Sequence, residues 1–85
     1  MIIKTHSGIG RLRGGAQYAS TGKADFYGGG EAYWVLSEKV EAHYGDSGGS
    51  LSDIHNDITG PLGLAPDDTL ALVKAAVREG YLKRI

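Results

Sequence analysis

The C-terminal segment, residues 65–85, constrains the fold of this chain more than any other stretch. Pro66 suits the first turn of a helix, where its missing N–H group would have no partner. The two aspartates that follow Pro66 place negative charge at the positive end of the helix dipole. Gly80 predicts the end of this helix, because glycine enters the left-handed conformation without steric cost. The segment therefore predicts a helix over residues 66–79 that leads directly into a short strand.

Two further helices are predicted from the spacing of apolar side chains. Residues 31–44 carry apolar and acidic side chains on opposite faces, although a buried strand over residues 33–36 is an alternative. The apolar face of this predicted helix comprises Ala32, Tyr33, Leu36, Val40, His43 and Tyr44. A shorter helix is predicted over residues 51–58, with Ser50 or Ser52 as its N-cap.

Most of the 14 glycines lie in the first half of the chain, between Gly8 and Gly49. We therefore predict that residues 1–30 form a glycine-rich β region. It would contain a strand at residues 2–6 and a hairpin that joins Gln17–Ser20 to residues 24–27. The C-terminal strand is expected to pair with residues 2–6.

We expect an α+β fold in a single domain over residues 1–85. A short antiparallel sheet, from the N-terminal half and the C-terminal strand, would pack against two or three helices. Leu62 and Leu64 are expected to hold the connector between the last two helices in the core.

Composition excludes several classes of protein. The 85 residues contain no cysteine, which excludes disulfides and thiolate metal sites. No apolar run reaches the roughly twenty residues that span a bilayer, and the first residues do not resemble a signal peptide. We therefore expect a cytoplasmic protein without membrane association.

Two short segments are similar to motifs of enzymes, but each lacks other features that the corresponding activity requires. Residues 45–49 read Gly-Asp-Ser-Gly-Gly, the string around the nucleophile of chymotrypsin-like proteases, but those enzymes need two barrels and a distant histidine. Residues 19–24 approach a phosphate-binding loop, yet Gln17 replaces its first glycine and Ala24 replaces its Ser or Thr. We therefore expect no enzymatic activity and no cofactor.

Five His and Asp residues between positions 43 and 57 are candidate metal ligands. No pair of them has a recognisable ligand spacing, and the segment also fails the pattern of a calcium loop. They are better explained as loop and cap residues, so no metal is expected. The residues concerned are His43, Asp46, Asp53, His55 and Asp57.

The central part of the chain is strongly acidic, with eight Asp or Glu residues and one lysine over residues 31–68. Trp34 lies off the apolar face of the predicted helix, near Glu38 and Glu41, and an exposed tryptophan beside acids is typical of an interface hot spot. Packing of Trp34 beneath the N-terminal hairpin is the alternative. The predicted partner-binding face comprises Glu31, Trp34, Glu38, Glu41 and Asp46.

The end of the chain, a helix followed by Gly-Tyr-Leu and two basic residues, resembles a winged helix-turn-helix domain over residues 34–85. In that family the third helix enters the major groove, which implies DNA binding by the chain's C-terminal half. The two aspartates that follow Pro66 would repel phosphates there. Residues implied by this alternative are Arg11, Arg13, Lys74, Arg78, Lys83 and Arg84.

Size, acidity and the lack of catalytic motifs favour a small non-catalytic binding protein. In style the chain is similar to small phage-encoded inhibitors of bacterial defence, such as anti-CRISPR proteins, although no motif is shared. The expected partner is a protein, for example a basic nucleic-acid-binding complex that an acidic surface can occlude. The alternatives are a winged-helix DNA-binding regulator and a structural subunit of an assembly.

Overall fold

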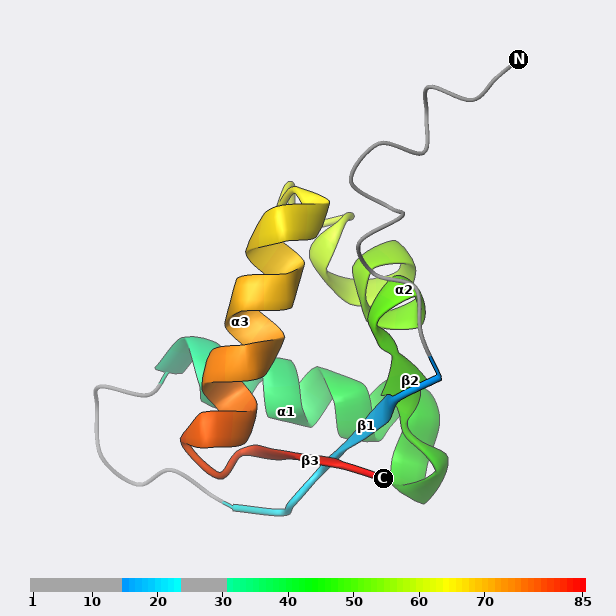
Figure 1. Cartoon of the computed structure of the whole chain (residues 1–85), viewed down its shortest axis with the longest axis vertical. Coiled ribbons are helices and arrows are strands. Elements are labelled where there is room, and N and C mark those ends of the chain that lie inside the picture. The colour runs from blue at the N-terminus through cyan, green and yellow to red at the C-terminus, as the bar shows by residue number, and fades with distance from the viewer. Residues whose placement is uncertain (1–14, 24–30) are drawn as a thin grey trace.

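The computed structural model describes residues 15–23 and 31–85. In these residues it confirms the expected α+β fold, with three helices and one antiparallel sheet (Figure 1). In chain order the elements are β1 (Gln17–Ser20), α1 (Glu31–Tyr44), the 3₁₀-helix η3 (Gly45–Ser47), β2 (Gly49–Ser50), α2 (Leu51–Ile54), the π-helix η4 (His55–Thr59), α3 (Pro66–Arg78) and β3 (Leu82–Arg84).

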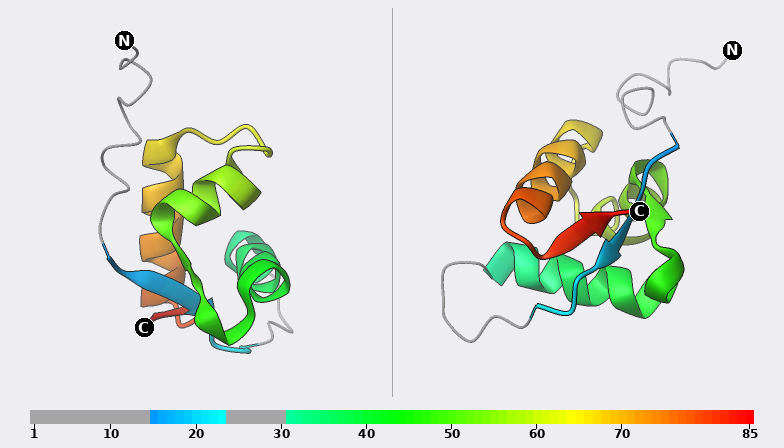
Figure 2. Two further views of the ribbon diagram at one scale, coloured as in Figure 1. Left: turned by 90° about the vertical axis from the view of Figure 1, so that its right-hand side faces the viewer. Right: turned by 60° about the horizontal axis from the view of Figure 1, so that its bottom comes forward.

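The sheet has the strand order β2-β1-β3, and its strands lie side by side in the views of Figure 2. β1 is central, because Tyr18 lies opposite Gly49 of β2 and opposite Arg84 of β3. The predicted strand at β1 is therefore present. The partners predicted for β1 and for the C-terminal strand, residues 24–27 and 2–6, lie outside the described residues.

α1 covers the residues predicted for it, so the alternative of a buried strand is wrong. Its buried positions are Leu36, Ser37 and Val40. Ala32 and His43, which were expected on the apolar face, are exposed. Tyr33 and Tyr44 are partly buried against the core, so apolar spacing alone wrongly includes only Ala32 and His43 in the buried face.

Ser50 is the N-cap of α2. Its hydroxyl accepts a hydrogen bond from the N–H of Asp53 at 3.1 Å, and the Asp53 carboxylate accepts one from the N–H of Ser50 at 3.2 Å. This reciprocal capping box satisfies two backbone donors that a helix start leaves unpaired. The chain then widens into η4, where the N–H of Gly60 donates to the carbonyl of His55 at 2.6 Å.

α3 begins at Pro66 as predicted and ends at Arg78, one residue earlier than expected. The carboxylate of Asp68 accepts a hydrogen bond from the N–H of Ala65 at 3.2 Å and so caps the helix start. Gly80 has a φ of +87° and turns the chain from α3 into β3. This positive φ is the conformation for which glycine was expected at that position.

All three helices and β3 contribute to one core in the described residues. α1 and α3 cross one another (Figure 1), and their buried side chains meet α2, η4 and β3 in this core. The connector between η4 and α3 does not behave as predicted, because Leu62 is 62% exposed and Leu64 is only half-buried. The core residues are Leu36, Val40, Ile54, Ile58, Val73, Ala76, Tyr81 and Leu82.

Substitution of Gly48 and of Gly63 by alanine tests how closely the chain at Gly48 packs against β1, with Gly63 as the control. Both have a positive φ, but a Cβ at Gly48 would lie 2.6 Å from the carbonyl oxygen of Tyr18, whereas one at Gly63 would meet nothing within 4 Å. We expect Gly48→Ala to lower the free energy of unfolding by about 3 kcal/mol or more. Gly63→Ala should cost about 1 kcal/mol. Urea unfolding measures both, and equal losses would contradict the close contact between Gly48 and β1.

Candidate functional site

A hollow of about 460 Å³ lies between α1 and the residues that end and follow β1. One wall is the outer face of α1, and the opposite wall is the chain from Ser20 to Lys23. Tryptophan, two glutamates and a lysine meet around one space, so the hollow combines an aromatic surface with charge of both signs. Its lining among the described residues is Ser20, Gly22, Lys23, Trp34, Ser37, Glu38, Glu41 and Ala42.

Trp34, Glu38 and Glu41 reach this hollow because positions four and then three residues apart lie on one face of a helix. Trp34 is half-buried and packs against the core, yet it also lines the hollow. Trp34 is thus only partly exposed, and residues 24–27 of the predicted hairpin, its alternative packing partner, lie outside the described residues. Glu38 and Glu41 are exposed, so their carboxylates are accessible from solvent.

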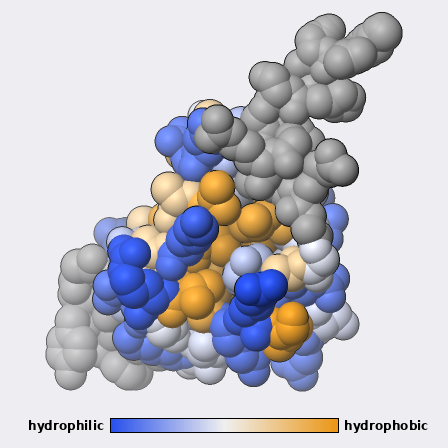
Figure 3. Space-filling view, viewed as in Figure 1, coloured by the Kyte–Doolittle hydropathy of each residue, from blue (hydrophilic) through white to orange (hydrophobic). Residues whose placement is uncertain are grey.

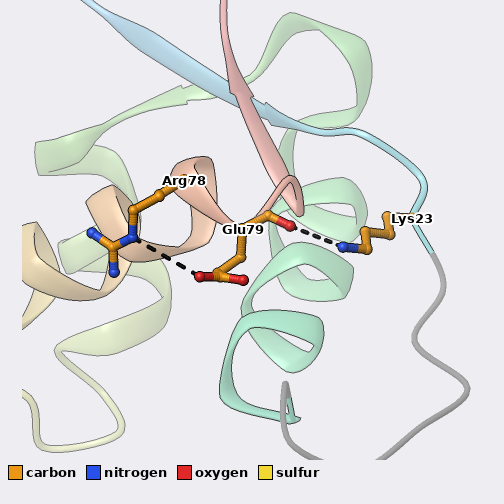
Figure 4. A network of polar contacts seen from close by, with 3 residues as sticks. All are labelled: Lys23, Arg78 and Glu79. Carbon is orange, nitrogen blue, oxygen red and sulfur yellow. Dashed lines mark hydrogen bonds and ion pairs between the residues drawn. The ribbon is translucent and has the colours of Figure 1, made fainter.

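Lys23 lies on the opposite wall, but its ammonium group already interacts with the end of α3 (Figure 4). Its Nζ donates a hydrogen bond to the carbonyl oxygen of Glu79 at 2.9 Å and lies 4.5 Å from the centre of the Tyr81 ring. A cation at the C-terminal end of α3 also interacts favourably with the helix dipole. Lys23 thus secures the end of α3, while the two glutamates keep their charge for another group.

Ser20 and Ser37 form the polar floor of the hollow. The Ser37 hydroxyl donates to the carbonyl of Tyr81 at 3.0 Å and lies 2.7 Å from the Ser20 hydroxyl. Because the only proton of Ser37 is used on Tyr81, Ser20 donates in the second bond. Sequence reasoning missed these two serines and Lys23. A serine between Tyr33 and Val40 on the apolar face of a helix is the signal that could have indicated Ser37.

The other two residues of the predicted acidic face lie elsewhere. Glu31, at the first turn of α1, lines a different groove together with Val35 and Lys39. Asp46 is exposed in η3 and does not line the hollow. The structure therefore brings together three of the five predicted residues, Trp34, Glu38 and Glu41, which we call the acid–tryptophan site.

The basic residues of the alternative interpretation are partly gathered on the face formed by α3 and β3. There, hydrophobic side chains are exposed between strongly hydrophilic ones (Figure 3). Lys74 and Arg84 line a small hollow of about 210 Å³ together with Tyr18 and Val77. This hollow brings cations from α3 and β3 to the same place.

Two more of the basic residues are exposed but lie outside this hollow. Arg78 lies 3.9 Å from the carboxylate of Glu79, and Lys83 is exposed on β3. The remaining two, Arg11 and Arg13, lie outside the described residues. Of the four described basic residues, Lys74 and Arg84 thus share the hollow, and Arg78 and Lys83 do not line it.

Three of the five candidate metal ligands form hydrogen bonds within the fold. Asp53 caps α2, Asp57 accepts a hydrogen bond from Tyr44, and His55 Nδ1 lies 3.1 Å from the Thr69 hydroxyl. Thr69 also contacts the hydroxyl of Thr59, and both threonines are buried. In residues 15–23 and 31–85, no three His, Asp or Glu side chains are grouped so that they could hold a metal ion.

The phenol of Tyr44 has a strongly raised pKa. Burial raises the pKa of its phenol well above the ordinary value. The hydrogen bond to the Asp57 carboxylate, at 2.8 Å, and the negative charges of Asp57 and Asp53 raise it further. The phenol is thus held neutral, as a donor that links the end of α1 to η4.

This shift predicts a loss of stability in alkali. A group with a raised pKa contributes its full stability below the pKa of the unfolded chain, about 10 for tyrosine, and loses it as the pH rises toward the folded value. The free energy of unfolding should therefore fall above about pH 10, and less so in Tyr44→Phe. Chemical denaturation across this pH range measures the difference.

A titration followed by phenolate absorbance isolates the cause. Asp57→Asn should lower the pKa of Tyr44, whereas Asp46→Asn, which removes an equal charge from η3, should leave it unchanged. An identical titration of Tyr44 in the Asp57→Asn variant would contradict the role of Asp57.

Comparison of the chain with models of protein families, with curated proteins and with solved structures finds no match. Within the described ranges, no helix has both the length and the apolar character needed to cross a lipid bilayer.

Proposed function

We propose that this protein is a non-catalytic protein-binding module that receives a basic side chain of its partner at the acid–tryptophan site. The observation that carries the proposal is the shared hollow of Trp34, Glu38 and Glu41. An indole ring attracts a cation over its face, and a carboxylate binds a guanidinium through two parallel hydrogen bonds. An arginine of the partner can satisfy both interactions in one hollow.

The surroundings of the site support a cation as the ligand. Lys23, the one basic residue among the described residues of the lining, is directed to the carbonyl of Glu79 and to the Tyr81 ring. No ion pair joins Glu38 or Glu41 to another described residue. The two carboxylates are therefore available to a partner, and the half-buried tryptophan supplies the apolar contact typical of a hot spot.

The partner class that fits this chemistry is a protein with a basic surface in the cytoplasm. A nucleic-acid-binding complex has such a surface, and an acidic protein that covers it competes with the phosphates of the nucleic acid. Inhibition of a bacterial defence complex by a phage-encoded protein is one activity of this kind. Steric and electrostatic occlusion of the basic surface would suffice for such inhibition, without any catalytic step.

The proposal can be tested with an arginine-rich peptide as the probe. Trp34 is the only tryptophan of the chain, so its fluorescence reports directly on the site. We expect the peptide to change this fluorescence with saturation, and Glu38→Gln or Glu41→Gln to weaken binding roughly tenfold each.

The matched control is Asp46→Asn, which removes the same charge outside the hollow and should change the affinity by less than about threefold. Equal losses in all three variants would indicate general attraction between an acidic protein and a basic peptide. That result, or an unchanged affinity in Glu38→Gln and Glu41→Gln, would refute the proposed site.

The second candidate function is DNA binding by a winged-helix domain, which the pairing of Lys74 with Arg84 in one hollow favours. Two cations from α3 and β3 can contact the phosphate backbone together. Against it stands the start of α3, where Asp68 caps the helix through Ala65 and would face the phosphates if this turn entered the major groove. For this reason we place DNA binding second.

Salt titration of binding to duplex DNA tests this alternative. If it holds, Lys74→Ala and Arg84→Ala should each weaken binding and each reduce the slope of log affinity against log salt by about 1. Lys39→Ala, on α1, is the control and should leave the slope unchanged. Binding that is absent at low salt would refute the DNA-binding alternative.

A further inference from the structure

A second surface of α1 borders an apolar groove of about 380 Å³, which α1 shares with η4, the connector after η4 and α3. Val35 and Ala32 contribute from α1, and Leu62 projects from the connector with 62% of its surface exposed. None of the three residues of the acid–tryptophan site lines this groove. Its lining comprises Glu31, Ala32, Val35, Leu36, Lys39, Ile58, Thr59, Leu62, Leu64 and Leu72.

The charges of this groove are arranged symmetrically along α1. Glu31 and Lys39 both line the groove, and Val35 is midway between them in sequence. Successive positions four residues apart form one stripe, and eight residues of helix span about 12 Å. Neither Glu31 nor Lys39 has an ion pair with another residue of the described ranges. One acid and one base thus lie at equal distances on either side of an apolar centre.

We propose that this groove is the contact between two copies of the chain, with their α1 helices antiparallel about a two-fold axis at Val35. In a two-fold interface, if residue i of one copy contacts residue j of the other, then j also contacts i. Glu31 of each copy therefore lies opposite Lys39 of the other, so the same ion pair forms twice. The two Val35 side chains meet at the axis, and each Leu62 covers the groove of the other copy.

Charge complementarity favours a second copy over other occupants. The stripe carries one acid and one base, so it is complementary to itself when reversed and offers no net charge to a basic or an acidic partner. Specific stable interfaces bury roughly 1,200–2,000 Å² in total, and the proposed contact uses one stripe of α1 and Leu62 of each copy. The dimer is accordingly weak and forms as the protein concentration rises.

Sedimentation velocity from micromolar to millimolar concentration at low salt tests this proposal without any other ligand. We expect reversible dimerisation of the native chain. Glu31→Lys places lysine opposite lysine, and Lys39→Glu places glutamate opposite glutamate. Each variant alone should weaken self-association roughly tenfold or more, because two attractive pairs become two repulsive ones.

Mixing the two variants provides the decisive measurement. Glu31→Lys carries a base at both ends of the stripe and Lys39→Glu an acid at both ends, so the two chains should form a heterodimer although neither self-associates. Lys74→Glu, on α3, is the control and should dimerise like the native chain. Circular dichroism of each variant checks that α1 is still folded.

A chain that stays monomeric at every concentration overturns the proposal, and so does a mixture of the two variants that stays monomeric. Dimerisation unaffected by the charge changes overturns the antiparallel register. A partner helix or a small apolar ligand as the true occupant would leave the native chain monomeric. The readout is independent of peptide binding at Trp34, so this inference and the proposed function fail separately.

Discussion

The carbonyl oxygen of Tyr81 joins three parts of the molecule that are distant in sequence. It accepts hydrogen bonds from the N–H of Thr21 at 3.1 Å and from the hydroxyl of Ser37 at 3.0 Å. These donors come from the chain after β1 and from α1, whereas Tyr81 lies between α3 and β3. A buried carbonyl without a partner costs about 1–3 kcal/mol, so the end of α3, the sheet and α1 are held in one mutual arrangement.

The same contacts determine the form of the acid–tryptophan site. Ser20, Ser37 and Lys23 hold the fold and also build the floor and one wall of the hollow, so their polar groups are occupied. The glutamates of the opposite wall have no such task. These hydrogen bonds fix the floor and one wall of the hollow, whereas the carboxylates of Glu38 and Glu41 remain available to a partner.

Local signals in the sequence predicted the helices well, because capping and apolar spacing are properties of neighbouring residues. Ser50 and Gly80 mark a helix start and a helix end where the structure has them. The neighbours of β1 were not predictable, since a strand of four residues takes its register from distant chain. Ser37 was missed and Leu62 was wrongly placed in the core, because whether a serine is buried or a leucine is exposed depends on what lies across the fold.

α1 is less amphipathic than α3, and it carries residues of both proposed surfaces, the acid–tryptophan site and the groove at Val35. α3 separates its apolar and polar faces clearly, whereas α1 does so weakly. A helix that packs only on one core is expected to be polar on its other sides. α1 buries Leu36 and Val40 in the core, yet it also carries Trp34 beside two acids and Val35 between Glu31 and Lys39. The core buries Leu36 and Val40 fully but Trp34 only in part, so the surfaces around Trp34 and Val35 are where partners of this protein are to be sought.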